Sequence, residues 1–310
     1  MDELPRVEGP AAQMVPLPSG VSPSGRQSPP DAALRSPVTS WPWWTAPLAL
    51  IGGLVLATLG GLIVAVAALV LGARISSSYT PPGVTIAGTF VQDVGFVLAS
   101  VYCAHIGRRA VHAWQFGLRR PSMGWRKAGL MVFVLLLAFL VFSVAWSEAF
   151  NPGREKVLEQ LGANEGRALL LLSAGLTCVV APICEEFLFR GFIFTALRNW
   201  WGTFRAALVT GLVFGGVHAL SAPALDLVPL AALGFGLCLL YRYTGSLYPG
   251  IVAHSLNNSL AFSALESWKL LEWRTLALTI GSLLAIGALV LTARRVGLID
   301  SDVSLVGSDA

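Results

Sequence analysis

The sequence predicts an all-α protein that crosses a membrane several times. Of its 310 residues, 55% are hydrophobic and 12% are charged, whereas soluble domains have roughly 25% charged residues. Several apolar runs reach or approach the roughly 18 residues that mark a transmembrane helix. These runs are continuous rather than apolar at every second position, which excludes a β-barrel of alternating strands. The composition therefore argues against a soluble enzyme.

The first 46 residues differ in composition from the rest of the chain. They hold nine of the 18 prolines and six serines, without an apolar period. Such a segment cannot bury enough apolar surface to form a core, so we expect residues 1–46 to be a disordered cytoplasmic tail. The segment lacks the apolar core and the cleavage site of a signal peptide, which predicts that the first apolar run is retained as a helix.

Apolar runs follow one another along the rest of the chain, and we expect about eight membrane-spanning helices. The expected spans are residues 47–73, 83–106, 128–147, 168–197, 204–220, 226–243, 247–265 and 276–293. Nine of the ten tryptophans lie within a few residues of a span end, where the indole ring prefers the headgroup region. They are Trp41, Trp43, Trp44, Trp125, Trp146, Trp200, Trp201, Trp268 and Trp273. We divide the membrane part into N-terminal helices (47–167), a central core (168–264) and a last helix with its tail (265–310).

Basic residues predict the orientation in the membrane. When alternate connections are assigned to alternate sides, most arginines and lysines fall on the side of the two termini, which the positive-inside rule places in the cytoplasm. The connection 107–127 combines arginine pairs with Trp114, Phe116 and Leu118, so we expect a helix lying on the cytoplasmic leaflet. Because the basic residues are scattered between apolar runs, the net charge of +4 does not indicate nucleic-acid binding.

Ionisable residues within the apolar runs cluster in the second half of the chain. Each such group costs roughly 2.5–3.5 kcal/mol at the centre of a bilayer, so each is a candidate for function. Glu186 and Arg190 are four residues apart and should form an ion pair on one helical face. Glu185 points about 100° away and lacks that partner. Pro182, just upstream, removes a backbone hydrogen bond, which should bend the helix and open it to water.

Two further spans add histidine and asparagine to this glutamate. His218 lies in the fifth span, and His254 and Asn258 share a face of the seventh span by their i, i+4 spacing. A carboxylate, two imidazoles and an amide are the components of a hydrolytic site, because they can activate a water and stabilise an oxyanion. We therefore expect Glu185, His218, His254 and Asn258 to converge on one water-accessible cavity.

Structural interpretations of the same residues remain open. The Glu186–Arg190 pair could serve only to join helices and to orient Glu185 without touching a substrate. A single buried histidine is usually a core residue, but two histidines beside an unpaired glutamate favour a functional site. Asp93 lies beside Gln92 and outside any motif, so we assign it to a hydrogen bond between helices.

Three motifs, each in its own span, resemble those of a known family. They are EExxxR at Glu185–Arg190, FxxxH at Phe214–His218 and HxxxN at His254–Asn258. In this order they resemble the signature motifs of the CPBP family, the CAAX-protease and bacteriocin-processing intramembrane endopeptidases. The resemblance covers residues 168–264, about a third of the chain, and every motif position is filled.

This resemblance implies an intramembrane endopeptidase and a role for each motif residue. Glu185 would activate the hydrolytic water with the help of His218, while His254 and Asn258 would bind the oxyanion or complete the site. By the same resemblance, the supporting residues would be Glu186, Arg190 and Phe214. The implied substrates are membrane-associated, either CAAX-like proteins or bacteriocin-type peptides, and the implied partners are membrane lipid and a peptide or protein substrate.

The cofactor stays open at the sequence level. One glutamate and two histidines match the ligand set of a catalytic zinc, so Glu185, His218 and His254 would be the ligands if a metal is bound. The sequence lacks the HExxH pairing that places two imidazoles on one helical turn. Without a metal, Glu185 is free to act as the general base, and each residue then has one role. We therefore favour a glutamate-activated water without an obligatory metal.

Two other classes of protein are kept as alternatives. One is a non-catalytic bacteriocin-immunity or binding scaffold, because a fold does not guarantee turnover. The other is a proton-coupled transporter that relays protons through Glu185, His218 and His254. The complete set of motifs argues against the scaffold. The absence of a matching set of ionisable groups in the first half of the sequence argues against the transporter.

Overall fold

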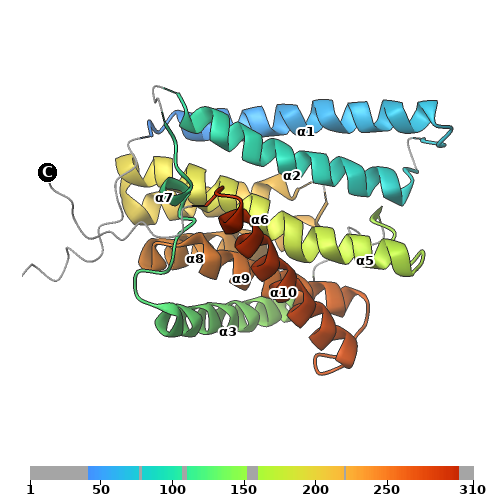
Figure 1. Cartoon of the computed structure of the whole chain (residues 1–310). Coiled ribbons are helices and arrows are strands. Elements are labelled where there is room, and N and C mark those ends of the chain that lie inside the picture. The colour runs from blue at the N-terminus through green and yellow to red at the C-terminus, as the bar shows by residue number, and fades with distance from the viewer. Residues whose placement is uncertain (1–40, 77–78, 107–109, 152–159, 220, 300–310) are drawn as a thin grey trace, which may run out of the picture. The chain divides into compact units, whose positions relative to one another are not determined.

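A computed structural model describes residues 41–76, 79–106, 110–151, 160–219 and 221–299 (Figure 1). Within them, the elements in chain order are α1 (Thr45–Val70), α2 (Pro82–Ala104), η2 (Ala113–Phe116), α3 (Trp125–Phe150), α5 (Arg167–Gly175), η3 (Leu176–Val180), α6 (Ala181–Glu186), η4 (Phe187–Phe194), α7 (Thr195–Val217), η5 (Ala224–Asp226), α8 (Leu227–Thr244), α9 (Leu247–Leu265) and α10 (Trp273–Arg295). Apart from one isolated bridge between Ser76 and Tyr79, the described residues form no β-structure. The all-α prediction is confirmed.

The described residues contain six helices that are long and apolar enough to cross a membrane. The predicted count of about eight is not confirmed by this measure, for two reasons. Residues Arg167–Val217 form one continuous helical stretch of 51 residues that includes two of the predicted spans. In addition, α9 is not among the six, because its histidine, asparagine and serine residues lower its hydropathy.

The long stretch bends at Gly202. Its φ of 76° and ψ of 172° are non-helical and lie in a region that glycine adopts without strain. Beyond this bend, α7 packs back against η4, so one sequence segment supplies two packed helices. The predicted division between residues 197 and 204 falls at this bend.

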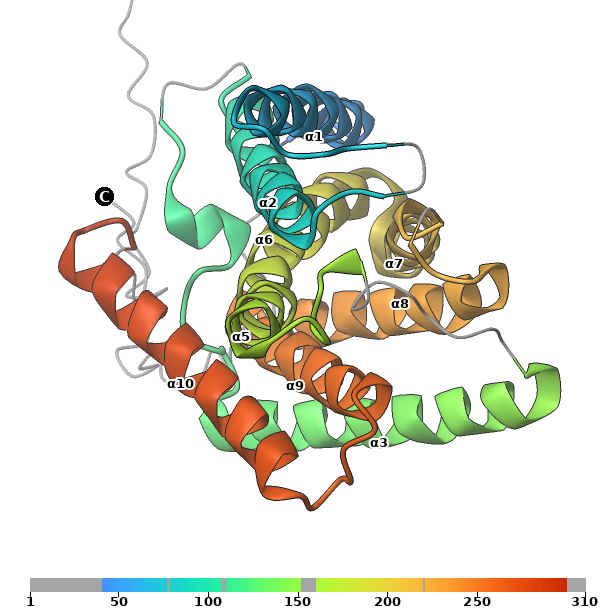
Figure 2. The same ribbon diagram turned by 90° about the vertical axis from the view of Figure 1, so that its right-hand side faces the viewer.

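The remaining helices pack around this pair. In the described part of the chain, α1 packs along α2 and α7 along α8 (Figure 1). Helix α9 contacts α3, α6, α8 and α10, and thus lies at the centre of the C-terminal helices (Figure 2). Large apolar side chains on the outer helices are exposed, among them Ile63 (69%), Leu130 (63%) and Leu284 (69%). Such surfaces indicate contact with lipid rather than with water.

Helices α7 and α8 approach each other through two glycines of α7. A Cβ atom on Gly211 would lie 2.7 Å from the Ala231 carbonyl oxygen, and one on Gly215 would lie 2.5 Å from the Leu227 carbonyl oxygen. The two glycines form a GxxxG pattern, in which small residues let helix backbones come close within a membrane. Phe214, between them, is 1% exposed and is fixed by this packing.

We expect Gly215→Ala to destabilise the protein by about 1–3 kcal/mol, because the added methyl group would push against the backbone of α8. The measurement is the free energy of unfolding in detergent. Gly216→Ala is the matched control, because a Cβ atom there meets nothing within 4 Å. If the two variants are equally stable, the close approach of α7 and α8 is wrong.

The connection 107–127 does not form the membrane-surface helix that we expected. Residues 107–109 lie outside the described part, and the following residues contain one short 3₁₀ turn, η2. Gly117, with φ 90°, ends this turn in a left-handed conformation. Pro121 follows shortly after, and proline cannot continue a helix.

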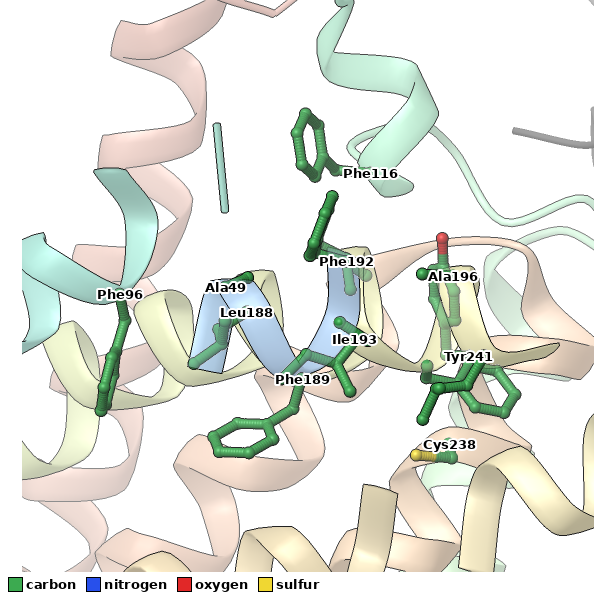
Figure 3. Packing of buried hydrophobic residues seen from close by; sticks show 14 of the residues in the cluster. Ala49, Phe96, Phe116, Leu188, Phe189, Phe192, Ile193, Ala196, Cys238 and Tyr241 are labelled. Carbon is green, nitrogen blue, oxygen red and sulfur yellow. The ribbon is translucent and has the colours of Figure 1, made fainter. Parts of the chain in front are cut away.

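The apolar side chains of this connection pack on the protein rather than on lipid. Phe116 is 3% exposed and lies beside Phe192 (Figure 3). The centre of its ring lies 4.3 Å from that of Phe187 and 5.0 Å from that of Trp41. Trp41 is fully buried in the same cluster, so its ring packs on protein side chains just before the start of α1. Residues 1–40 of the predicted tail lie outside the described residues.

The same connection holds the start of α9. The Leu247 backbone N–H donates to the Gly117 carbonyl at 2.8 Å, and Ser246 Oγ donates to the Arg119 carbonyl at 2.5 Å. Arg119 Nε in turn donates to the Gly245 carbonyl at 2.7 Å. These bonds fix the N-terminal end of the helix that carries His254 and Asn258.

Candidate active site

Pro182, near the start of α6, shapes the helix that carries the first motif. A proline has no N–H, so it leaves backbone carbonyls one turn earlier without a helical partner. The Cys178 carbonyl accepts a hydrogen bond from Ser255 Oγ at 2.6 Å, and the Thr177 carbonyl accepts one from Asn258 Nδ2 at 3.0 Å. Both donors belong to α9, so the carbonyls near the proline become the attachment points for this helix.

The backbone on both sides of α6 is π-helical. Such wide turns, with hydrogen bonds from residue i to i+5, are frequent at functional sites. The preceding turn is η3, and the following turn, η4, contains Arg190. The EExxxR motif therefore begins in a short α-helical segment and ends in a wider one, a local geometry that the spacing of the motif does not reveal.

Glu186 joins two cationic or polar side chains inside the protein. Its Oε1 accepts a hydrogen bond from Arg190 Nη1 at 2.6 Å and lies 3.0 Å from His254 Nδ1. Glu186 and Arg190 are fully buried, and the His254 side chain is 4% exposed. The predicted ion pair is confirmed, but Glu186 also contacts His254, a contact that we did not predict. Gly250 allows the approach, since a Cβ atom there would lie 2.7 Å from Glu186 Oε2.

Arg190 links this centre to α7 and α8. Its Nη2 donates to the Gly234 carbonyl at 3.0 Å, and its guanidinium carbon lies 4.5 Å from the centre of the Phe214 ring. A cation over an aromatic face is attracted by the ring quadrupole. The Phe214 ring also meets the His254 ring edge-on, with centroids 5.6 Å apart. Phe214 therefore supports both residues, in line with the supporting role implied by its motif.

Glu185 lies on the other side of His254. Its Oε2 is 3.8 Å from His254 Nε2, and its side chain is 14% exposed. Within the described residues, this oxygen is buried without a hydrogen-bond partner. A separation of more than 3.5 Å between polar atoms is characteristic of a bridging water. The single imidazole of His254 thus stands between two carboxylates with different surroundings.

Asp93 of α2 is a residue whose position the sequence did not explain. It is 1% exposed, and neither carboxyl oxygen has a hydrogen-bond partner among the described residues. The hydrogen bond between helices that we expected is therefore wrong. Asp93 interacts electrostatically with Glu185, and α2 packs against α6. A buried polar group normally bonds to the protein or to water, so an ordered water is the natural partner for this carboxyl.

His218 occupies the end of α7 and contacts this centre through an aromatic ring. Its Nδ1 lies 2.7 Å from the Phe214 carbonyl oxygen, so Nδ1 carries a proton and donates it. The His218 and Phe214 ring centroids are 5.0 Å apart. No hydrogen bond or ion pair joins His218 to Glu185 within the described residues. His254, rather than His218, is the imidazole beside Glu185.

Asn258 contributes to the attachment of α9. One N–H of its amide donates a hydrogen bond to the Thr177 carbonyl, and its Oδ1 accepts a hydrogen bond from Asn257 Nδ2 at 3.3 Å. An asparagine amide has two N–H donors, so the second one remains for a ligand. The structure thus brings Glu185 and His254 together, keeps His218 one aromatic ring away and uses half of the Asn258 amide for packing.

The ligand set considered for zinc does not come together. Within the described residues, no three His, Cys, Asp or Glu side chains are grouped closely enough to hold a metal ion. We therefore derive the chemistry from the side chains alone.

The fold and this centre define a class: an all-helical membrane protein with glutamate, arginine and histidine buried among its helices. Residues 167–260 match the family model described as Type II CAAX prenyl endopeptidase Rce1-like. This match agrees with the resemblance drawn from the three motifs. It coincides closely with the predicted core, residues 168–264.

One curated relative extends the likeness beyond this segment. It is named "Putative membrane peptidase YdiL" of Bacillus subtilis (strain 168) and is 31% identical over 138 residues. The alignment includes 44% of this chain and 54% of the relative, so the chain spans about half the length of that protein. No solved structure matches the chain.

Proposed function

We propose that the protein is an intramembrane endopeptidase that hydrolyses peptide bonds with a water activated by Glu185. The observation that carries this proposal is the placement of His254, with Nδ1 on Glu186 and Nε2 3.8 Å from Glu185 Oε2. This arrangement provides a base, an orienting imidazole and a buried ion pair behind it, which together are typical of a hydrolytic site.

The contacts of His254 set its protonation. The Glu186 carboxylate favours a proton on Nδ1, so in the neutral ring Nε2 is left as an acceptor. A water between Nε2 and Glu185 Oε2 would then donate one proton to each, and its oxygen lone pair would point away from both. Such a water is held by two acceptors and is ready to attack a carbonyl carbon.

The reaction follows from this placement. The water oxygen forms a bond to the carbonyl carbon of the substrate while Glu185 takes one of its protons, which gives a tetrahedral oxyanion. The C–N bond then breaks, and Glu185 returns the proton to the departing amine nitrogen. The second Asn258 N–H is our candidate for stabilising the oxyanion. Arg190 stays behind Glu186 and pairs with its carboxylate.

The family description and the exposed apolar helices favour membrane-associated substrates. The matched family is named for CAAX prenyl endopeptidases, and we propose CAAX-like or other lipid-proximal peptides as the substrate class. We place the protein in the cell membrane with both termini in the cytoplasm. The scaffold and transporter alternatives gain no specific support from the site.

The test is proteolysis of a membrane-associated peptide library by the purified protein in detergent, read by mass spectrometry. We expect cleavage at defined peptide bonds. A transporter or a scaffold would leave every peptide intact while still binding some of them.

We further propose that Asp93 helps to hold the attacking water. Its two unpartnered oxygens and Glu185 Oε2 are all buried, and such groups are commonly satisfied by ordered water. Asp93→Asn keeps the shape and the ability to bond a water, so we expect cleavage within about tenfold of wild type. Asp93→Leu cannot bond a water, and we expect a loss on the order of 100-fold, as for a misplaced reacting group.

The measurement for these variants is kcat/KM for one cleaved peptide, beside the free energy of unfolding. The Leu variant should be at least as stable as wild type, because it replaces a buried polar group that has no protein partner. Equal activity of the Asn and Leu variants would show that Asp93 does not hold the attacking water.

A further inference from the structure

A groove lies between the first part of the long helical stretch and α10, apart from the residues of the proposed active site. Its volume is about 830 Å³, within the range of ligand-binding pockets. One wall is formed by α5 and η3, the other by α10. Most of its lining is apolar, with small residues that make room between the helices; examples are Leu170, Ala174, Val179, Leu278, Gly281 and Ala285. Neither Glu185 nor a histidine lines it.

The groove has the length of one leaflet of a bilayer. On α5 and η3 its lining runs from Arg167 to Val179, and on α10 from Trp273 to Ala285. The α10 stretch rises about 18 Å at the pitch of an α-helix, and the other wall, part of which is π-helical, rises somewhat less. The hydrocarbon of one leaflet is about 15 Å thick, half of the bilayer core. The groove is therefore long enough to run from the membrane surface to about the midplane.

The chemistry of the two ends differs. The first residues of the two walls and the turn before α10 supply Arg167, Arg274, Trp268 and Trp273, whereas the later turns of both walls supply mostly aliphatic side chains. Arg274 stacks near both indole rings, at 5.8 Å from each ring centre, and its Nε lies 3.5 Å from Glu272 Oε1. Arg167 is exposed and forms no ion pair among the described residues. Tryptophan and arginine are typical of the headgroup region.

We propose that this groove binds a phospholipid with an anionic headgroup. One acyl chain lies along the apolar walls toward Val179 and Ala285, and the phosphate contacts Arg167 and Arg274. Charge complementarity selects the occupant: two arginines face one carboxylate, that of Glu272, so the end of the groove keeps a net positive charge. A zwitterionic lipid offers less attraction. The proposal does not depend on the peptidase activity.

Native mass spectrometry of the purified full-length protein in detergent tests this proposal. Wild-type protein should bind phosphatidylglycerol more tightly than phosphatidylcholine. Each arginine near a membrane surface contributes about a fivefold gain in binding of anionic lipid. Arg167→Gln and Arg274→Gln should each weaken phosphatidylglycerol binding about fivefold. The matched control is Arg74→Gln, an exposed arginine outside the groove on the same predicted side of the membrane.

A second pair of variants tests the acyl-chain part. A Cβ atom on Gly281 meets nothing within 4 Å, so Gly281→Leu would fold and place a side chain in the groove. Gly287→Leu, also with open space around its Cβ atom but outside the lining, is the control. Only the Gly281 variant should lose bound lipid. Equal binding of both lipids by wild type would overturn the proposal. So would an Arg74→Gln effect as large as those of the two groove arginines, or equal lipid binding by the two glycine variants. These outcomes are independent of the peptidase assay.

Discussion

Glu185→Gln is expected to lower kcat/KM for peptide cleavage by about 10²- to 10⁴-fold, the range typical of a lost general base. The amide has nearly the same shape as the carboxylate but cannot take a proton from a water. Glu185 Oε2 has no hydrogen-bond partner in the described part of the protein, so the substitution breaks no structural bond there. Stability should therefore remain close to that of wild type.

Glu165→Gln is the matched control for this variant. Glu165 is exposed in the connection before α5, and the same chemical change there should leave cleavage unaffected. The measurement is the steady-state rate with one peptide in one detergent for all three proteins. Wild-type activity in Glu185→Gln would end the proposal of a glutamate-activated water, whereas inactive wild-type protein would end the proposal of an endopeptidase.

Glu186→Gln is expected to cause the largest loss of stability, about 3–5 kcal/mol. Removal of one partner of a buried ion pair leaves the other charge uncompensated. Arg190 is fully buried, and the glutamine oxygen, the Gly234 carbonyl and two aromatic rings around its guanidinium would carry no full negative charge to balance it. Activity should also fall, because His254 Nδ1 loses its anionic acceptor.

The double variant Glu186→Gln with Arg190→Gln separates the charge effect from the packing effect. Replacement of both partners removes the uncompensated charge, so the double variant should be more stable than Glu186→Gln alone. The free energy of unfolding in detergent is the quantity to compare. If Glu186→Gln is as stable as wild type, the two charges do not depend on each other in the way that the 2.6 Å contact implies.

Much of the fold was predictable from hydropathy, because lipid requires long apolar helices. The helical class and the Glu186–Arg190 pair follow from run length and from i, i+4 spacing. The number of spans was harder, since α9 carries the polar residues of the site and resembles a span only in its length. The prediction for the connection 107–127 was wrong, because its aromatic residues are as compatible with a membrane surface as with a protein core.

The pairing of side chains within the site could not be predicted from the sequence. Motif spacing places Glu185, His218 and His254 on three helices, but the rotation of each helix decides which imidazole lies beside the glutamate. Gly250 carries a signal that could have been used: a glycine one turn before His254 indicates a close approach on that face. Nothing in the sequence around Asp93 indicates that α2 packs against α6.

The attachment of α9 has a consequence for how the protein is made. On its own, this helix would bring a histidine and two asparagines into hydrocarbon, which is costly. The hydrogen bonds that attach it to the rest of the protein, as described above, all go to earlier residues, namely Gly117, Arg119, Thr177, Cys178 and Glu186. Because synthesis runs from the N-terminus, these partners are already in the bilayer when α9 emerges. We therefore expect α9 to enter the membrane by docking on the preceding helices, so that insertion of α9 and assembly of the site are one event.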